Sequence, residues 1–221
     1  MAKKDKVGGS KISFKAQPKK KKSGPPTDAA PYPRLKQHYA DVVAPALKEK
    51  YGYGSPLATP RITKVVVSMG VGDAHENPRK FETLIEQMET VTGQRPQVTR
   101  ARVSVANFKL REGMAVGCRV TLRRTRMWEF LDRLITIVIP RMRDFRGLNP
   151  KSFDGRGNFA MGLQDQLVFP ELKADKIDHM HGMNIVVCTT ARTNDEAREL
   201  IRLTGFPFRD LPVTILGSKE S

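Results

Sequence analysis

A stretch of nineteen residues, Arg141 to Phe159, concentrates side chains that bind phosphates and stack on nucleobases. It contains five Arg or Lys, three Phe and three Gly, and it has neither helical nor strand periodicity. Guanidinium groups grip phosphates and aromatic faces stack on bases, and loops of this length are often functional. The alternative is a solvated loop whose Phe side chains fill the core beneath it, and composition alone does not decide between the two. The basic residues of this loop are Arg141, Arg143, Arg146, Lys151 and Arg156.

The charge of the whole chain also favours a polyanionic partner. The 221 residues include 39 Lys and Arg against 23 Asp and Glu, a formal net charge of +16. About half of this excess lies in residues 1–34, where nine Lys and Arg34 face only Asp5 and Asp28. A field of this size attracts phosphate backbones. Since the other half belongs to the rest of the chain, we expect a basic folded body as well as a basic tail.

Residue types that catalyse reactions or hold metals form no recognisable constellation. The four histidines lack HExxH spacing, and the two cysteines are too far apart for a metal pair, so we expect buried, reduced thiols. The segment Gly70–Ala74 lacks the third glycine of a dinucleotide fingerprint and the GK[ST] of a phosphate loop. Asp144 and Asp154 lie among arginines that would keep them ionised, the wrong state for a general acid. The sequence therefore predicts no catalytic residue, no metal and no cofactor. The histidines and cysteines are His38, His75, His179, His181, Cys118 and Cys188.

The composition divides the chain into three parts. Residues 1–34 have few large apolar side chains and many Lys, Gly, Ser and Pro, so they cannot bury enough surface to offset chain entropy, and we expect them to be disordered when free. No apolar run follows the lysines, and no stretch approaches the roughly 18 to 20 apolar residues of a membrane span. The expected organisation is a basic N-terminal extension (1–34), one domain (35–210) and a short C-terminal extension (211–221). We expect an intracellular, soluble protein without a membrane partner.

Hydrophobic periodicity predicts alternating helices and strands after residue 34. The order is helix, strand, helix, strand, strand, helix, strand, strand, helix, with Pro45 expected to kink or locally loosen the first helix. Several hairpin-like neighbours in this order predict an α+β sandwich with a mostly antiparallel sheet and helices on one face. The predicted helices cover residues 35–47, 78–91, 127–138 and 194–204, and the predicted strands cover 61–69, 97–105, 114–124, 160–169 and 183–190.

Strand alternation between residues 116 and 123 separates an apolar side from a polar, basic side. Lys64 and Ser68 likewise share one side of the strand at 61–69. A sheet that is covered by helices on one face and shows Arg, Lys and hydroxyl groups on the other resembles a nucleic-acid platform more than an enzyme cleft. An ordinary solvated sheet face is the alternative. The apolar side contains Val116, Cys118, Val120 and Leu122, and the polar side contains Gly117, Arg119, Thr121 and Arg123.

Five collinear segments between Leu35 and Asp210 have a distinctive sequence. They are MGVGDA (69–74), TGQRP (92–96), GCRVTLRRTRMWEFLDRLI (117–135), IPRMRDFRGLNPKSFDGRGNF (139–159) and GFPFRD (205–210). Together they closely resemble the bacterial family of large-subunit ribosomal proteins that bind 5S ribosomal RNA, the fifth of the L series. The resemblance implies a ribonucleoprotein-like sandwich, with an antiparallel sheet backed by helices.

The resemblance also implies a non-catalytic, ribosome-bound role in the cytoplasm. Members of this family join 5S rRNA to the central protuberance of the large subunit, beside 23S rRNA. They also approach the elbow of peptidyl-site tRNA and a protein of the small-subunit head. The partners expected from the resemblance are therefore these RNAs and neighbouring ribosomal proteins.

The family's principal 5S rRNA contacts, carried over by position, fall on Ser68, Gln94 and Thr121, with Arg119 and Arg123 nearby. At the first of these the family usually has asparagine, and a serine hydroxyl is shorter than a carboxamide and lacks its two fixed donors.

The tRNA-facing loop of the family resembles Ser104–Gly113, where Asn107, Lys109 and Arg111 are the candidate contacts. The resemblance leaves the partner of the Arg141–Phe159 loop open.

Two other classes of protein would also carry a basic platform. A free nucleic-acid-binding regulator would act independently of ribosome assembly, whereas a ribosomal protein would co-sediment with large subunits. An RNA-modifying enzyme should show a cofactor fingerprint or a paired acid and base, and the sequence contains neither.

Overall fold

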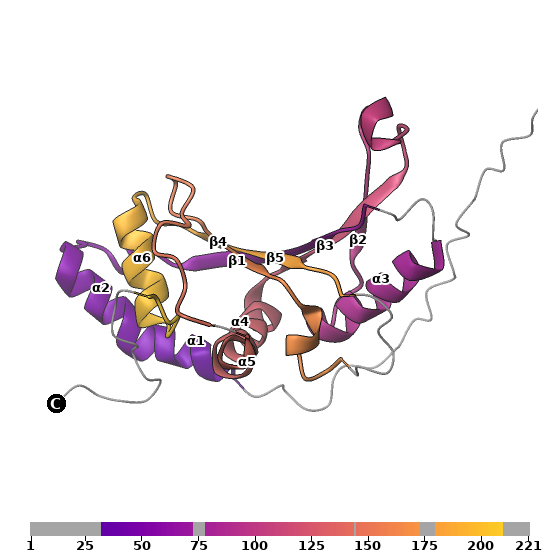
Figure 1. The fold of residues 1–221 in the computed structure, drawn as a ribbon. Helices are drawn as coiled ribbons and strands as arrows, with labels where there is room; N and C mark the ends of the chain where they lie inside the picture. Colours follow the sequence, from indigo (N-terminus) through magenta and orange to yellow (C-terminus); the bar gives the residue numbers. More distant parts are fainter. Residues whose placement is uncertain (1–31, 73–77, 144, 173–179, 210–221) are drawn as a thin grey trace, which may run out of the picture. The chain divides into compact units, whose positions relative to one another are not determined.

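Five strands pair into one sheet in the order β2-β3-β1-β5-β4, and all four pairings are antiparallel (Figure 1). The central strand β1 is rich in β-branched residues and lies between β3 and β5, so its backbone is paired on both sides. This arrangement confirms the predicted α+β fold. The strands are β1 (Ile62–Gly70), β2 (Gln97–Arg100), β3 (Ala115–Leu122), β4 (Phe159–Leu163) and β5 (Met183–Thr189).

The structure is a computed structural model that describes residues 32–72, 78–143, 145–172 and 180–209. All of these residues belong to one unit that begins at Tyr32. The predicted disorder of residues 1–34 concerns residues outside this part of the chain, apart from its last three. The predicted C-terminal extension at 211–221, His75, Asp144 and His179 also lie outside the described residues.

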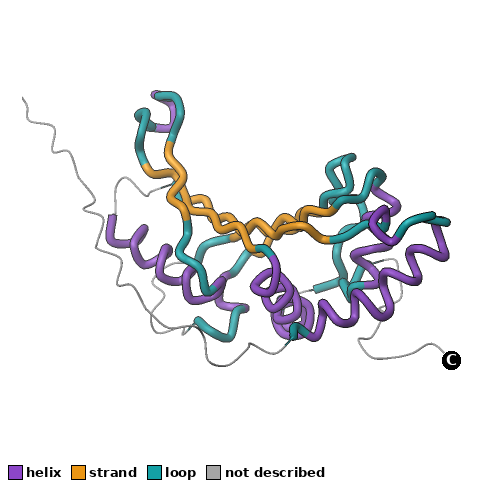
Figure 2. Tube along the Cα trace, turned by 180° about the vertical axis from the view of Figure 1, so that it is seen from behind, coloured by secondary structure: helices purple, strands orange, loops and turns teal. Residues whose placement is uncertain are grey.

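The helices gather on one face of the sheet, as Figures 1 and 2 show. Alternate residues of the strands point into the core beneath that face, and Val65, Val67 and Leu122 are fully buried there. Within the core, the Cys118 thiol lies 3.8 Å from the sulfur of Met88 on α3. The helices are α1 (Arg34–His38), α2 (Ala44–Tyr51), α3 (Pro78–Thr92), α4 (Arg124–Arg133), α5 (Ile139–Arg141) and α6 (Asn194–Leu203).

Two prolines sit inside helical segments, and each follows a π-helical turn. One turn, Tyr39–Val43, joins α1 to α2 just before Pro45, and the other, Leu134–Val138, joins α4 to α5 just before Pro140. Proline lacks the N–H for the bond to residue i−4 and its ring crowds that carbonyl, so a wider turn before it relieves both problems. The predicted loosening at Pro45 is confirmed. The predicted helix at 127–138 extends further at both ends, because α4 begins at Arg124 and α5 ends at Arg141.

Two strands are shorter than predicted. The segment 97–105 pairs with β3 only as far as Arg100, because the chain then enters a narrow projecting hairpin. The segment 160–169 stops being a strand at Leu163 and continues into a short 3-10 turn, Gln166–Val168. In both cases apolar residues recur beyond the last paired residue, Val103 and Val105 in the first segment and Leu167 to Phe169 in the second, which is why the sequence pattern alone extends the strand.

Candidate nucleic-acid interface

The face of the sheet opposite the helices carries a polar row that crosses all five strands. The strand register places Gln97 opposite Arg119, Arg119 opposite Ser68, and Ser68 opposite Asn184. Gly162 of β4 ends the row opposite Asn184. Within the row, Arg119 Nε donates a hydrogen bond of 3.4 Å to Oε1 of Gln97. The row thus aligns a guanidinium, a hydroxyl and two carboxamides on one surface.

The predicted site residues on the sheet lie on this open face. Ser68 belongs to the polar row and is half-buried, and Arg119 is exposed. Thr121 pairs with Val66 in the next row and is half-buried, so its hydroxyl stands beside an apolar neighbour. Arg123 is exposed and directly follows β3 at the start of α4. In the part of the chain that the structure describes, the side chains of Ser68 and Thr121 make no hydrogen bond.

Gln94 lies outside the sheet, in the turn between α3 and β2. Gly93 there has a φ of 65°, a left-handed conformation that glycine adopts without strain. The hydroxyl of Thr92 donates to the carbonyl of Gln94 at 3.0 Å and accepts from its N–H at 3.4 Å, which fixes the main chain of Gln94. Because β2 runs antiparallel to β3, the turn before β2 approaches the end of β3 where Thr121 lies. The structure therefore brings the main chain of Gln94 near the end of β3.

A hairpin between β2 and β3 projects beyond the sheet (Figures 1 and 2). Its tip is closed by a bridge between Val105 and Leu110, and Lys109 adopts a left-handed φ of 52° at the turn. The predicted tRNA-facing residues Asn107, Lys109 and Arg111 are all exposed at this tip.

Several hydrogen bonds hold the base of the hairpin. Arg100 Nη1 donates to the carbonyl of Gly113 at 2.8 Å, and the N–H of Gly113 donates to the carbonyl of Ala101 at 3.0 Å. The N–H of Glu112 donates to the hydroxyl of Ser104 at 3.0 Å. These bonds join the two arms of the hairpin below its tip.

The sequence prediction missed Phe108, whose ring is 72% exposed at the hairpin tip. An exposed aromatic ring next to Lys109 can stack on a base or cover a ribose. The only signal in the sequence is a large apolar residue inside a segment without periodicity, and the same signal is given by loop aromatics that fill a core.

The Arg141–Phe159 loop separates its basic residues from its aromatic ones. Its five basic residues, Arg141, Arg143, Arg146, Lys151 and Arg156, are exposed. Two of its aromatic residues instead follow the alternative interpretation, in which they pack into the core. Phe159 is fully buried, and its ring lies 5.6 Å from that of Phe208 and 5.1 Å from that of Phe153. The loop thus offers charge to a partner, and the rings of Phe153 and Phe159 stabilise the core.

Asp154 organises the tip of that loop. Its carboxylate accepts hydrogen bonds from the N–H of Arg156 at 2.8 Å, from the N–H of Asn158 at 3.0 Å and from the side-chain amide of Asn158 at 2.6 Å. These bonds, first among them the one from the Asn158 side chain, lower the pKa of the Asp154 carboxyl. The carboxylate is ionised as predicted, but backbone and amide donors favour it rather than guanidinium groups.

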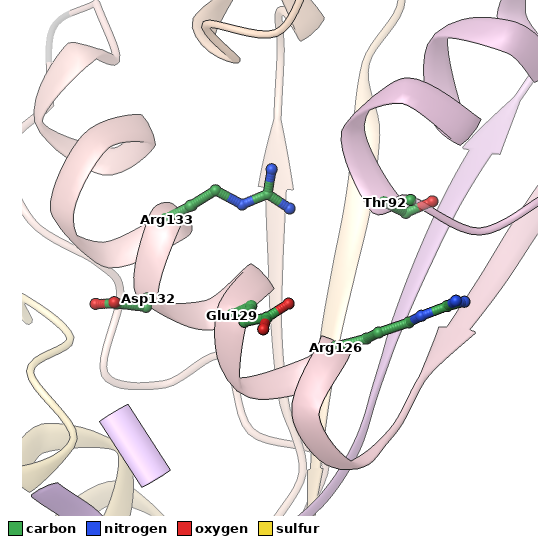
Figure 3. A pocket seen from close by; sticks show the side chains of 6 residues that line it. Thr92, Arg126, Glu129, Asp132 and Arg133 are labelled. Atoms are coloured by element: carbon green, nitrogen blue, oxygen red, sulfur yellow. The ribbon is translucent and has the colours of Figure 1, made fainter. Parts of the chain in front are cut away.

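An open pocket of about 480 Å³ lies on the helix side, between the end of α3 and the outer face of α4 (Figure 3). Arg133 at its wall forms an ion pair with Glu171 and donates to the carbonyl of Val91 at 3.0 Å. Figure 3 shows Asp132 pointing away from the other labelled side chains, and it pairs with Arg34 at 2.7 Å. The pocket is lined by Thr92, Gly93, Arg126, Glu129, Asp132 and Arg133.

The described residues contain no group of three or more His, Cys, Asp or Glu that could hold a metal ion. His38 is bonded through Nε2 to the carbonyl of Leu203 at 3.1 Å, a structural contact between α1 and the end of α6. Both cysteines are free thiols; Cys118 is buried, which raises its pKa to about 11, and Cys188 is half-buried. Among the helices of the described ranges, none combines the length and the apolar composition that crossing a membrane requires.

Comparison with known proteins gives a consistent result along most of the chain. Residues 55–111 match the model of the family "Ribosomal protein L5", and residues 115–208 match the model for the C-terminus of the same ribosomal family. The large ribosomal subunit protein uL5 of Rubrobacter xylanophilus is 57% identical over 176 residues, which cover 80% of this chain and 98% of the relative. The protein of the same name from Alkaliphilus oremlandii is 54% identical over 175 residues, which cover 79% and 98%.

Proposed function

The chain belongs to the ribosomal protein L5 family, and from that premise we propose that the open face of its sheet binds 5S rRNA. As a member of this family it is a structural constituent of the large ribosomal subunit, ribosome-bound in the cytoplasm, and not an enzyme. rRNA binding is typical of such proteins. The identity of the RNA and the surface that binds it are the proposal.

The observation that carries the proposal is the set of polar side chains without partners on and beside the open face. Ser68, Gln94 and Thr121 make no side-chain hydrogen bond with another described residue, and each is only half-buried. An RNA strand lying on this face would pair these groups with its own donors and acceptors. Arg119 and Arg123 would neutralise its phosphates.

The test is the affinity of Gln94→Ala and Thr121→Ala for isolated 5S rRNA. Each variant should lose about 1 to 3 kcal/mol of binding free energy, because the RNA group that it served is left unpaired. Gln37→Ala and Thr136→Ala remove the same chemical groups from the helix side and should bind as the wild type does. Circular dichroism checks that every variant is folded. Unchanged affinity in both site variants would overturn the assignment of this surface.

A second ligand is proposed for the projecting hairpin, where Asn107, Lys109 and Arg111 would contact peptidyl-site tRNA. The support is the exposure of all three residues at a tip that lies beyond the sheet. Charges at such a tip can reach a ligand that moves, whereas charges on the sheet cannot follow it.

The proposal also covers the division of the chain and the partners of the basic loop. We propose that residues 35–210 act as the 5S rRNA-binding domain between two extensions, 1–34 and 211–221. The exposed basic residues of the Arg141–Phe159 loop are candidates for contacts with 23S rRNA or with a protein of the small-subunit head. Sedimentation of the tagged chain with large subunits, rather than as a free protein, distinguishes this role from that of a free regulator.

A further inference from the structure

Three arginines lie close together in the turn where β3 ends and α4 begins. Arg123, Arg124 and Arg126 are all exposed, and their guanidinium groups make no ion pair with another described residue. The first turn of α4 contains no acidic residue, and no side chain caps its start. Like charges so close together repel one another, and the positive end of a helix adds to the repulsion. A bound anion would relieve this cost.

Arg124 also adopts a backbone conformation that disfavours its side chain. Its φ is 53°, and among the described residues only Lys109 shares a positive φ without being glycine. Glycine would adopt this conformation without strain. The strain does not identify a ligand, but it provides a way to remove the guanidinium without harming the fold.

One arginine of this turn, Arg126, lies near the end of α3. Arg126 lines the same pocket as Thr92 and Gly93, and Figure 3 shows its side chain extending from the start of α4 to the side of the pocket where Thr92 lies. Arg95, two residues beyond Gly93, is exposed and has no ion-pair partner among the described residues.

The acidic residues at this corner do not balance the arginines. Within the described part of the chain, Glu129 is the one carboxylate of the pocket lining that is not in an ion pair, because Asp132 pairs with Arg34. This corner therefore has an excess of positive charge. The three arginines of the turn and Arg95 stand against one pocket carboxylate, Glu129, that is not already in an ion pair with another described residue.

The corner is continuous with the open face of the sheet. Along β3, Arg119 and Thr121 lie on that face, and Arg123 continues their alternation directly into the turn. We propose that Arg124 and Arg126, with Arg95, bind the phosphates of an RNA strand that leaves the open face at the end of β3 and passes around the edge of the sheet to the helix side. The inference rests on the proposed function. Because guanidinium groups at a turn meet phosphates rather than base edges, this contact adds affinity without sequence readout.

The salt dependence of RNA binding tests the proposal on the full chain. The probe is a 5S rRNA transcript, with an unrelated RNA of equal length for comparison. In Arg124→Gly/Arg126→Ala, the slope of log affinity against log salt should become shallower by about 1.4 to 1.8, because each of the two phosphate contacts that are removed contributes roughly 0.7 to 0.9. The ratio of affinities for the two RNAs should stay the same. Lys48→Ala/Arg192→Ala removes equal charge from α2 and from the segment just before α6, and its slope should stay near that of the wild type.

Arg124→Gly alone separates an RNA contact from a structural role. Its melting temperature should equal or exceed that of the wild type, because the strain is removed, while its slope becomes shallower by about 0.7 to 0.9. The proposal is overturned if the double variant and the Lys48/Arg192 control have the same slope, or if no RNA binds. If Gln94→Ala and Thr121→Ala bind 5S rRNA normally while the double variant has a shallower slope, the proposed open-face site fails and the phosphate corner stands.

Discussion

Ser68 lies at the centre of the polar row, between Arg119 on β3 and Asn184 on β5. At this position the side chain meets any RNA strand that lies flat on the sheet. Its hydroxyl has one donor and is shorter than the carboxamide that the family resemblance leads us to expect at this position. Ser68→Asn should therefore bind 5S rRNA as tightly as the wild type or more tightly, measured by titration at fixed salt. Weaker binding with an intact fold would mean that the row has no space for a longer side chain, and that Ser68 contacts RNA through a closer approach.

Asp154 gives the basic loop a dependence on pH. Its pKa is lowered in the fold, so the stabilisation that it provides is present above the ordinary Asp pKa of about 3.9 and is lost as the pH falls through the lower, folded value. The amide signals of Arg156 and Asn158, whose N–H groups donate to this carboxylate, should shift together in an acid titration by NMR, with a midpoint below that of a free aspartate. Asp154→Asn should abolish this titration. A midpoint at or above the ordinary value would contradict the bonding described for the carboxylate.

Among the elements, the hairpin between β2 and β3 separates most clearly from the sheet. Replacing Lys109 and Arg111 together with Ala removes two exposed charges from its tip and leaves the bonds at its base in place. We expect normal folding and 5S rRNA affinity, but weaker retention of peptidyl-site tRNA in assembled ribosomes, measured by filter binding. The exposed Lys48 and Arg192 provide the matched control. Loss of 5S rRNA affinity would mean that the hairpin belongs to the same 5S rRNA-binding surface as the open face of the sheet. Unchanged tRNA retention would mean that Lys109 and Arg111 are solvent-exposed charges without a tRNA contact.

Strand alternation predicted which side chains of β3 face away from the helices, because that periodicity is a local property of the chain. Arg119 and Thr121 are accordingly on the open face. It could not predict the burial of Phe153 and Phe159, because their partners include Phe208, which is distant in sequence and reaches them only in the fold. The register of β2 and β3, which brings Gln94 toward Thr121, is also a tertiary property. The resemblance to a family, rather than any local pattern, is what assigned both residues to one predicted RNA-binding surface.

The distribution of charge over the whole molecule leads to a prediction for the tail. Residues 1–33 hold nine of the 39 Lys and Arg, all of them Lys. Ammonium groups act on phosphates as point charges and do not read bases, so deleting this segment should weaken binding to every RNA. The salt slope should fall by about 0.7 to 0.9 for each lysine–phosphate pair that the deletion removes, while discrimination between 5S rRNA and an unrelated RNA of equal length stays the same. A large loss of discrimination would place a specific site within the tail.

The edge of the sheet at β4 affects how readily the RNA-free protein associates with other copies of itself. An unpaired edge strand can pair with the same strand of another copy and start aggregation. Here the segment around Ser152 and Phe153 lies along that edge: the N–H of Ala160 donates to the carbonyl of Ser152 at 3.0 Å, and Phe153 bridges to Phe159. The exposed Lys151 and Arg156 flank this segment and repel a second, equally basic copy. The loop thus covers part of this edge strand and leaves less unpaired backbone open to edge-to-edge association.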